Sequence, residues 1–284
     1  MSLIPLTVLA LLASGLVADP PHACEACDEW NRPHQAFRVH GDTWYVGTAG
    51  VGAVLITSPD GHILIDGGLP QSAPLIADNI REAGFRLEDV KLIVNSHTHY
   101  DHAGGISALQ RASGPAVAAS PAARQALEHG GPRDNDPQFA FGPAANDFPA
   151  VKPVREINDR ETLRVGPLAI TAHFTPGHTP GGTSWSWKSC EGARCLDLVY
   201  ADSLNAVSAP GFRFDDAGRI ATFERSIARL ESLPCDILLA AHPSAVDMDS
   251  RLPDLRDPSA CRNYAAGARQ RLQARLAEER AASP

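Results

Sequence analysis

The sequence predicts an α/β protein in which two β-sheets pack face to face with helices outside. Short β-rich segments occupy two separate parts of the chain, and segments of helical periodicity follow each part. The 284 residues have an ordinary globular composition, 44% hydrophobic and 20% charged, and this length suits one α/β domain. Because a sheet must bury a face and a helix a stripe, this order of segments favours two packed sheets covered by helices.

The first β-rich part contains three short strands and a helix. The strands are predicted at residues 44–46, 51–57 and 62–66. Asp60-Gly61, between the last two, is a typical hairpin turn. Residues 72–83 place apolar side chains at helical spacing, and Gly84 ends the helix.

A buried strand at residues 91–95 leads directly into a histidine-rich turn. Gly104 and Gly105 then open a helix over residues 106–111, before a strand near 116–119 and a helix from Ser120. Residues 130–153 are rich in glycine and proline and carry few periodic apolar residues. We predict a long surface loop there, and loops of that length are usually functional.

The second β-rich part begins near residue 162. Strands are predicted at residues 168–173, 183–187, 198–201 and 237–241. Helices are predicted at 221–233 and 259–279, and the last helix places Tyr264, Ala268, Leu272 and Leu276 on one stripe.

Residues 1–18 are predicted to be an export signal. Residues 3–17 are almost wholly apolar, too few for a comfortable membrane span, and small residues precede Ala18. No Lys or Arg precedes the run, so a buried first strand or helix is the alternative. We predict cleavage after Ala18, which leaves a single domain at residues 19–284 in the periplasm.

Six cysteines agree with export, because an even number in an oxidising compartment suggests disulfides. The spacing of Cys24 and Cys27 would suit half a zinc ribbon or a redox motif, but no second pair of that spacing completes a ribbon. The predicted disulfides are Cys190–Cys195 and Cys235–Cys261, with Cys24 and Cys27 paired together or left as thiols.

The formal net charge is −8, and the chain has no basic run. An acidic protein of this kind offers no electrostatic footprint for nucleic acid or an anionic membrane. We therefore expect no nucleic-acid or membrane partner. The protein is also expected to be a monomer that acts on a small-molecule substrate.

Metal-binding residue types are concentrated in six positions of the histidine-rich turn. His97, His99, Asp101 and His102 follow the strand and precede the glycine pair. A turn can direct such side chains to one point, which a regular helix or strand cannot do. Imidazole and carboxylate are ligands that Zn²⁺ prefers. The four residues could close one structural site or be shared between two metals.

Two further histidines decide between these alternatives. His178 lies in a turn-rich stretch, residues 176–182, and His242 directly follows the strand at 237–241. Either one alone would usually be a surface or core residue. Both lie at strand ends, where α/β folds place ligands. Six candidate ligands permit two three-ligand catalytic sites.

These residues resemble the metallo-β-lactamase superfamily. The motifs are HTHYDH at residues 97–102, PGHTPGG at 176–182, AHP at 241–243 and LIDGG at 64–68. More narrowly, the chain resembles class B β-lactamases of the third subclass in YADSL at 200–204, TSWSW at 183–187 and Cys261-Arg262-Asn263-Tyr264. The match runs from about Trp44 into the C-terminal helix.

The resemblance implies a four-layer αβ/βα sandwich with two Zn²⁺ ions at one edge. It assigns His97, His99 and His178 to one zinc, and Asp101, His102 and His242 to the other. It implies hydrolysis of the β-lactam amide bond of penicillins, cephalosporins and carbapenems by a metal-bound hydroxide, with Asp101, His97 and His178 catalytic. Such an enzyme confers antibiotic resistance.

Other roles follow less directly. By resemblance, Ser203 and Asn205 contact the substrate carboxylate, although this subclass usually has Ser or Thr where Asn205 stands. Gln138 matches a position that in some relatives touches substrate or the bound water. Asp66 is interpreted as the acceptor for a metal-bound histidine, or alternatively as a cap on the glycine turn.

The main rival function is that of another superfamily hydrolase, such as a thioesterase of the glyoxalase II kind, a lactonase or a phosphodiesterase. These enzymes share the HxHxDH motif and often bridge both metals with an aspartate where Asp202 stands. The export signal and the hydrogen-bond donors Ser203 and Asn205 favour a β-lactamase. We expect Asp202 to hold its own strand end rather than a metal. A scaffold protein without catalysis would normally show a broken ligand set, and all six ligands are present.

Overall fold

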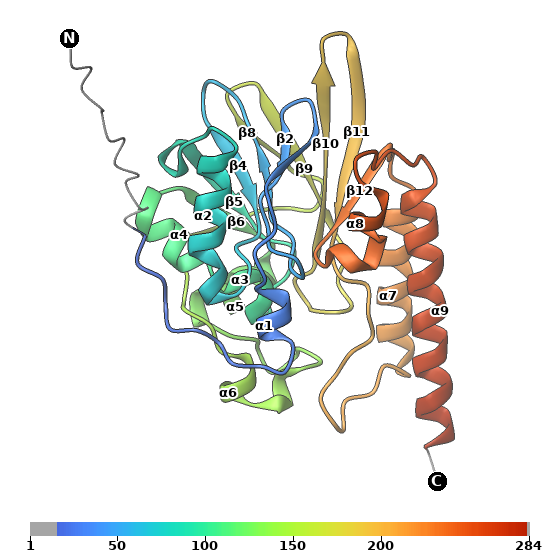
Figure 1. Ribbon diagram of the computed structural model, residues 1–284. Coiled ribbons are helices and arrows are strands. Elements are labelled where there is room, and N and C mark those ends of the chain that lie inside the picture. The colour runs from blue at the N-terminus through green and yellow to red at the C-terminus, as the bar shows by residue number, and fades with distance from the viewer. Residues whose placement is uncertain (1–15, 283–284) are drawn as a thin grey trace, which may run out of the picture.

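The computed structural model describes residues 16–282 and arranges them in four layers, with helices outside two central sheets (Figure 1). The strand order is β1-β2-β3-β4-β5-β6-β7 in the first sheet and β12-β11-β10-β9-β8 in the second. Both sheets are mixed, since each contains parallel and antiparallel pairs. The predicted αβ/βα sandwich is confirmed.

The first sheet changes from antiparallel to parallel pairing at β4. Its strands are β1 Phe37–His40, β2 Thr43–Tyr45, β3 Val54–Ile56, β4 His62–Ile65, β5 Val90–Val94, β6 Ala116–Ala119 and β7 Val154–Glu156. Strands β4 to β7 run parallel. Parallel strands need long crossovers, which here contain α2 Ala73–Glu82, α4 Ile106–Ser113 and α5 Pro121–His129.

The second sheet is antiparallel except at one edge. Its strands are β8 Thr162–Val165, β9 Leu168–Phe174, β10 Thr183–Glu191, β11 Arg194–Ala201 and β12 Ile237–Ala240. Strands β11 and β12 are parallel, and α7 Ala217–Glu231 connects them. The last helix, α9 Ala260–Ala281, packs beside α7 (Figure 1).

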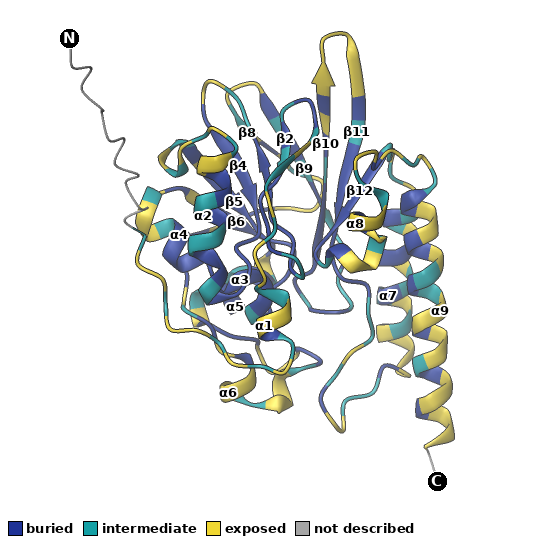
Figure 2. Cartoon of the chain, viewed as in Figure 1, coloured by how far each residue is buried: buried dark blue, intermediate teal, exposed yellow. Residues whose placement is uncertain are grey.

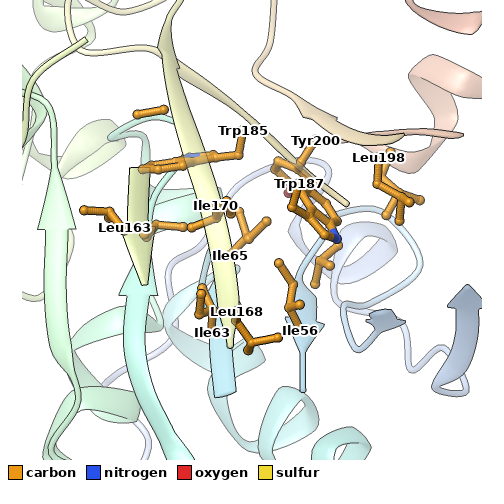
Figure 3. Packing of buried hydrophobic residues seen from close by; sticks show 14 of the residues in the cluster. Ile56, Ile63, Ile65, Leu163, Leu168, Ile170, Trp185, Trp187, Leu198 and Tyr200 are labelled. Carbon is orange, nitrogen blue, oxygen red and sulfur yellow. The ribbon is translucent and has the colours of Figure 1, made fainter. Parts of the chain in front are cut away.

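Three apolar clusters hold the four layers together, and the burial pattern follows them (Figure 2). Trp185, Trp187 and Tyr200 fill the space between the sheets together with Ile65 of β4 (Figure 3). A second cluster joins the first sheet to α2, α4 and α5, and a third joins the second sheet to α7 and α9. Strand β4 is buried along its whole length because it lies between the inner cluster and α2.

Several predicted boundaries need correction. Strands β1 and β7 were not predicted from the sequence. They are the two edge strands of the first sheet, which therefore extends to Glu156, just before the second β-rich part expected from residue 162. Strands β10 and β11 are longer than predicted. The segment at 130–153 is not simply a surface loop, since Phe148 and Val151 are buried. Short helical segments also occur: α1 Cys27–Trp30, η1 Pro70–Ser72, η2 Leu87–Asp89, α3 Tyr100–Ala103, η3 Phe139–Phe141, α6 Pro143–Asn146, η4 Pro243–Val246 and α8 Met248–Arg251.

All six cysteines form disulfides. The pairs are Cys24–Cys27, Cys190–Cys195 and Cys235–Cys261, which confirms the two predicted pairs and settles the third. Most of the leader predicted at residues 1–18 lies outside the described residues. Among the helices of residues 16–282, none is long and apolar enough to cross a bilayer.

Candidate metal centre

The six candidate ligands meet at one edge of the two sheets. The turn after β5 and the short helix α3 carry the four clustered residues, the β9–β10 loop carries His178, and the end of β12 carries His242. These segments converge at the lower ends of the strands near α3 (Figure 1). The sequence therefore placed all six residues at strand ends that the fold brings together.

Two glycines let the histidine-rich turn pass close to the LIDGG turn. A Cβ atom on Gly105 would lie 2.1 Å from the carbonyl oxygen of Gly67, and one on Gly67 would lie 2.6 Å from the amide of Ile106. The amide of Gly67 donates to the carbonyl of His102 at 2.9 Å. Only glycine allows this backbone approach, which fixes the height of α3 above the sheet.

Asp101, His102 and His242 form a compact triangle of ligand atoms. Oδ2 of Asp101 lies 3.1 Å from Nε2 of His102 and 3.3 Å from Nε2 of His242, and the two Nε2 atoms are 3.3 Å apart. Two atoms that each lie about 2.0–2.1 Å from one tetrahedral zinc are about 3.3 Å apart. The triangle therefore has the size that a single tetrahedral ion requires.

His97, His99 and His178 form a second group. Their ligand atoms lie within 4.8 Å of one another, and so do those of His97, Asp101 and His102. The two groups therefore adjoin through His97. Three imidazoles beside a triangle that contains a carboxylate make a donor set suited to divalent metals such as zinc.

Hydrogen bonds outside the cluster orient most of the rings. Nδ1 of His178 donates to the carbonyl of Asn205, and Nδ1 of His242 to the carbonyl of Gly50, both at 2.9 Å. Each bond leaves Nε2 available as a ligand atom. Metal-bound histidines almost always make such an outer bond, which fixes the tautomer.

Buried carboxylates take the same outer position at three other histidines. Oδ1 of Asp202 lies 2.9 Å from Nδ1 of His97, and Oδ1 of Asp136 lies 3.3 Å from Nε2 of His99. Asp66 lies farther away, with Oδ2 3.7 Å from Nδ1 of His102.

Asp66 serves the turn more than it serves His102. Its carboxylate accepts from the Ser96 amide and hydroxyl, both at 2.6 Å, from Asn95 at 3.0 Å and from the Tyr200 hydroxyl at 2.9 Å. These contacts fix the turn after β5 and the Tyr200 hydroxyl. The 3.7 Å separation from Nδ1 of His102 is longer than a hydrogen bond, so neither role expected from the sequence is shown.

Electrostatics keep two of the rings neutral. Burial, followed by repulsion from His99, lowers the pKa of His178 to about 3. Burial and the neighbouring imidazoles hold the pKa of His97 well below its usual range. Burial also opposes the charge on His102, but the adjacent Asp101 carboxylate raises the pKa of His102 to about 10. His97 and His178 are therefore held in the neutral form that binds metal.

The predicted substrate contacts lie on two loops next to this cluster. Ser203 is buried, whereas Asn205 is partly exposed and its carbonyl is the acceptor for His178. Gln138 is partly exposed, and its backbone amide donates to Oδ1 of Asp136 at 2.8 Å.

The sequence did not reveal the contacts of Asp136 or of the carbonyls of Gly50 and Asn205 with the histidines. No local pattern marks them, since Asp136 is 37 positions from His99 and Gly50 is 192 from His242. Nor did the sequence reveal the contact of Asp202 with His97. The one available signal was the position of Asp136 in a loop expected to be functional.

Comparison with known proteins agrees with this geometry. The Rm3 metallo-β-lactamase has 50% identity and a TM-score of 0.87, over 91% of this chain and 99% of that chain. MEM-A1, described as a subclass B3 metallo-β-lactamase isolated from a soil metagenome library, has 48% identity and a TM-score of 0.86, over 89% and 100%.

A more distant relative has another activity. Hydroxyacylglutathione hydrolase of Anaeromyxobacter dehalogenans (strain 2CP-C) is 31% identical over 74% of this chain. The aligned region covers 65% of that relative's length. The family model of the metallo-β-lactamase superfamily matches residues 47–242. Because the matched residues run from the first sheet to His242 and enclose the whole ligand cluster, the chain belongs to the metallo-β-lactamase superfamily.

Proposed function

We propose that the protein is a two-zinc β-lactamase that hydrolyses the amide bond of penicillins, cephalosporins and carbapenems and so confers antibiotic resistance. The observation that carries this proposal is the adjoining pair of donor groups at the sheet edge, one of three histidines and one of Asp101, His102 and His242. Support comes from the 50% identity to the Rm3 metallo-β-lactamase over 91% of the chain.

The ligands divide between the two ions by proximity. His97, His99 and His178 would hold the first zinc, and Asp101, His102 and His242 the second. The 3.1–3.3 Å separations in the second group support this division. The outer contacts on Nδ1 of His97, His178 and His242 support Nε2 as the ligand atom of each ring.

Each group of residues has a distinct task in the proposed reaction. Bound zinc would supply Lewis acidity toward the lactam carbonyl and would lower the pKa of water toward neutrality. Asp101 brings the only carboxylate to the second group, and its other oxygen would accept a proton from the attacking water. Ser203 and Asn205 would donate hydrogen bonds to the substrate carboxylate, with Gln138 on the facing loop.

Thioester hydrolysis is the second candidate, because a hydroxyacylglutathione hydrolase is 31% identical to the chain. An enzyme of that kind would use Asp202 as a bridge between two metals. In this protein Oδ1 of Asp202 is occupied by the ring of His97 at 2.9 Å and by the amide of Ser203 at 2.8 Å. This arrangement supports the β-lactamase.

Hydrolysis assays separate the two candidates. We expect the purified protein to hydrolyse nitrocefin and imipenem, to lose both activities in EDTA, and to regain them when zinc is added back. A glutathione thioester is the matched substrate for the rival. Hydrolysis of the thioester with no turnover of either β-lactam would refute the proposal.

We also propose that the enzyme is exported to the periplasm and acts as a monomer. The six paired cysteines support export, since disulfides persist in oxidising compartments. Sequencing the N-terminus of periplasmic protein should find cleavage after Ala18, and light scattering should give the mass of one chain. An uncleaved N-terminus or a dimer mass would refute the respective statement.

A further inference from the structure

The carboxylate of Asp136 connects a ligand histidine to a loop beside the metal centre. Asp136 is only 3% exposed, although its neighbours at positions 133–135 are exposed. One oxygen, Oδ1, accepts from the amide of Gln138 at 2.8 Å and lies 3.3 Å from Nε2 of His99. The same atom therefore contacts both the loop backbone and the ring.

The turn at residues 133–141 holds Asp136 in place. The amide of Asp136 donates to the carbonyl of Arg133 at 2.8 Å, and its carbonyl accepts from the amide of Phe139 at 3.1 Å. The side chain of Asn146 donates to the carbonyl of Gln138 at 2.9 Å. The position of the carboxylate thus depends on the conformation of the turn.

A single backbone hydrogen bond joins this turn to the loop that contacts His178. The amide of Ala209 donates to the carbonyl of Pro137 at 2.9 Å. Ala209 lies in the loop at residues 203–212, in which the carbonyl of Asn205 accepts from His178 at 2.9 Å. Two of the three proposed ligands of the first metal, His99 and His178, are therefore held from outside by two loops that are bonded to each other.

These loops also carry the residues expected to meet the substrate. Gln138 lies on the turn, and Ser203 and Asn205 lie on the other loop. A movement of either loop would change both the substrate contacts and the outer hydrogen bonds of the first group. In the second group, the outer acceptor of His242 is the carbonyl of Gly50, which belongs to neither loop.

We propose that Asp136 is a positioning residue that fixes the ring of His99 and couples the two substrate-facing loops to the first metal site. A carboxylate acceptor at Nε2 keeps the proton on that nitrogen, which leaves the lone pair of Nδ1 for the metal. The inference rests on the proposed assignment of His99 as a ligand.

Three variants separate positioning of His99 from support of the loop. Asp136→Asn keeps an oxygen that can accept from the Gln138 amide but removes the charge facing His99. Asp136→Ala removes both contacts. Asp134→Asn makes the same chemical change at an exposed position two residues away and is the matched control.

Zinc affinity and the Co²⁺ absorption spectrum are the readouts. Loss of an outer-shell partner typically costs about 10–100-fold in metal affinity. We expect Asp136→Asn to bind the first zinc at least about tenfold more weakly. The second zinc should bind as in the wild type, and the visible spectrum of the Co²⁺ protein should change. Thermal unfolding of the metal-free protein should be the same for Asp136→Asn and the wild type.

Two results would overturn the inference. Asp136→Asn could bind both ions as the wild type does while Asp136→Ala alone is weakened, in which case the carboxylate serves only the loop. Alternatively, Asp134→Asn could lose as much affinity as Asp136→Asn. Neither readout needs substrate turnover, so a wild-type protein that binds two zinc ions but hydrolyses no β-lactam would refute only the proposed function.

Discussion

Oδ1 of Asp202 lies 2.9 Å from Nδ1 of His97, and both side chains are almost completely buried. The same carboxylate accepts from the amide of Ser203 at 2.8 Å. Asp202 therefore does hold its strand end, as the sequence predicted, but it also orients a proposed ligand. This second contact was not predicted, and it places the aspartate against the ring of a proposed ligand.

Replacing Asp202 tests that role. We expect Asp202→Asn to weaken binding of the first zinc by roughly 10–100-fold, because an amide replaces the carboxyl group that faces Nδ1 of His97. Competition with a coloured chelator measures the change. Asp197→Asn is the control, because Asp197 lies on β11 just before Asp202 and its carboxylate is paired to exposed Lys188. Unchanged affinity in Asp202→Asn would show that His97 needs no such acceptor.

Asp101→Ala should leave one zinc per chain. Asp101 is the only anionic member of the second group, and its Oδ2 contacts both histidines of that group at 3.1 and 3.3 Å. We expect the variant to lose the second ion and, with it, nitrocefin hydrolysis. Metal analysis of dialysed protein measures the first loss, and initial rates measure the second. Asp134→Ala, at an exposed site, should keep both ions. Two zinc ions and full activity in Asp101→Ala would contradict the ligand division.

The sequence was sufficient to identify the six clustered residues that we propose as ligands, because their signal is local. Four of them lie in six residues, and the other two follow apolar or turn-rich segments that identify strand ends. The strands β4, β5 and β12 were equally clear, since each is a short apolar run.

The outer partners of His97, His99, His178 and His242 could not be found in this way. Asp136 reaches His99 only because the turn at 133–141 folds back over the centre, and this path depends on long-range bonds such as Ala209 to Pro137. Strand β7 was missed for a similar reason. It has three residues, two of them exposed, and only its pairing with β6 makes it a strand.

The disulfide between Cys235 and Cys261 should contribute more stability than the one in the β10–β11 hairpin. Its cysteines are 26 positions apart, against 5 for Cys190 and Cys195. In the chain-entropy model these loops correspond to roughly 3.5 and 2 kcal/mol. We expect Cys235→Ser/Cys261→Ser to lower the free energy of unfolding in urea more than Cys190→Ser/Cys195→Ser does. The reverse order would show that native packing, not loop closure, dominates.

Acid should destabilise the metal-free protein partly through His173, which lies on β9 with Nε2 2.8 Å from the Ser186 hydroxyl. Burial, and then the charge of Arg229, lowers the pKa of His173 from 6.5 to about 4. Between these values the unfolded chain binds the proton and the folded chain does not. Protons therefore favour unfolding, and stability falls as the pH drops from about 6.5 toward 4.

His173→Gln removes this titration while an amide can still bond to Ser186. We expect the variant to lose less unfolding free energy than the wild type between pH 7.5 and 5, as measured by urea denaturation in EDTA. All other histidines are the same in the variant and the wild type, so the difference between the two losses isolates His173. His129→Gln, at the exposed end of α5, is the control and should follow the wild type. Equal losses in His173→Gln and the wild type would show that His173 takes up its proton at the same pH in the folded and unfolded chains.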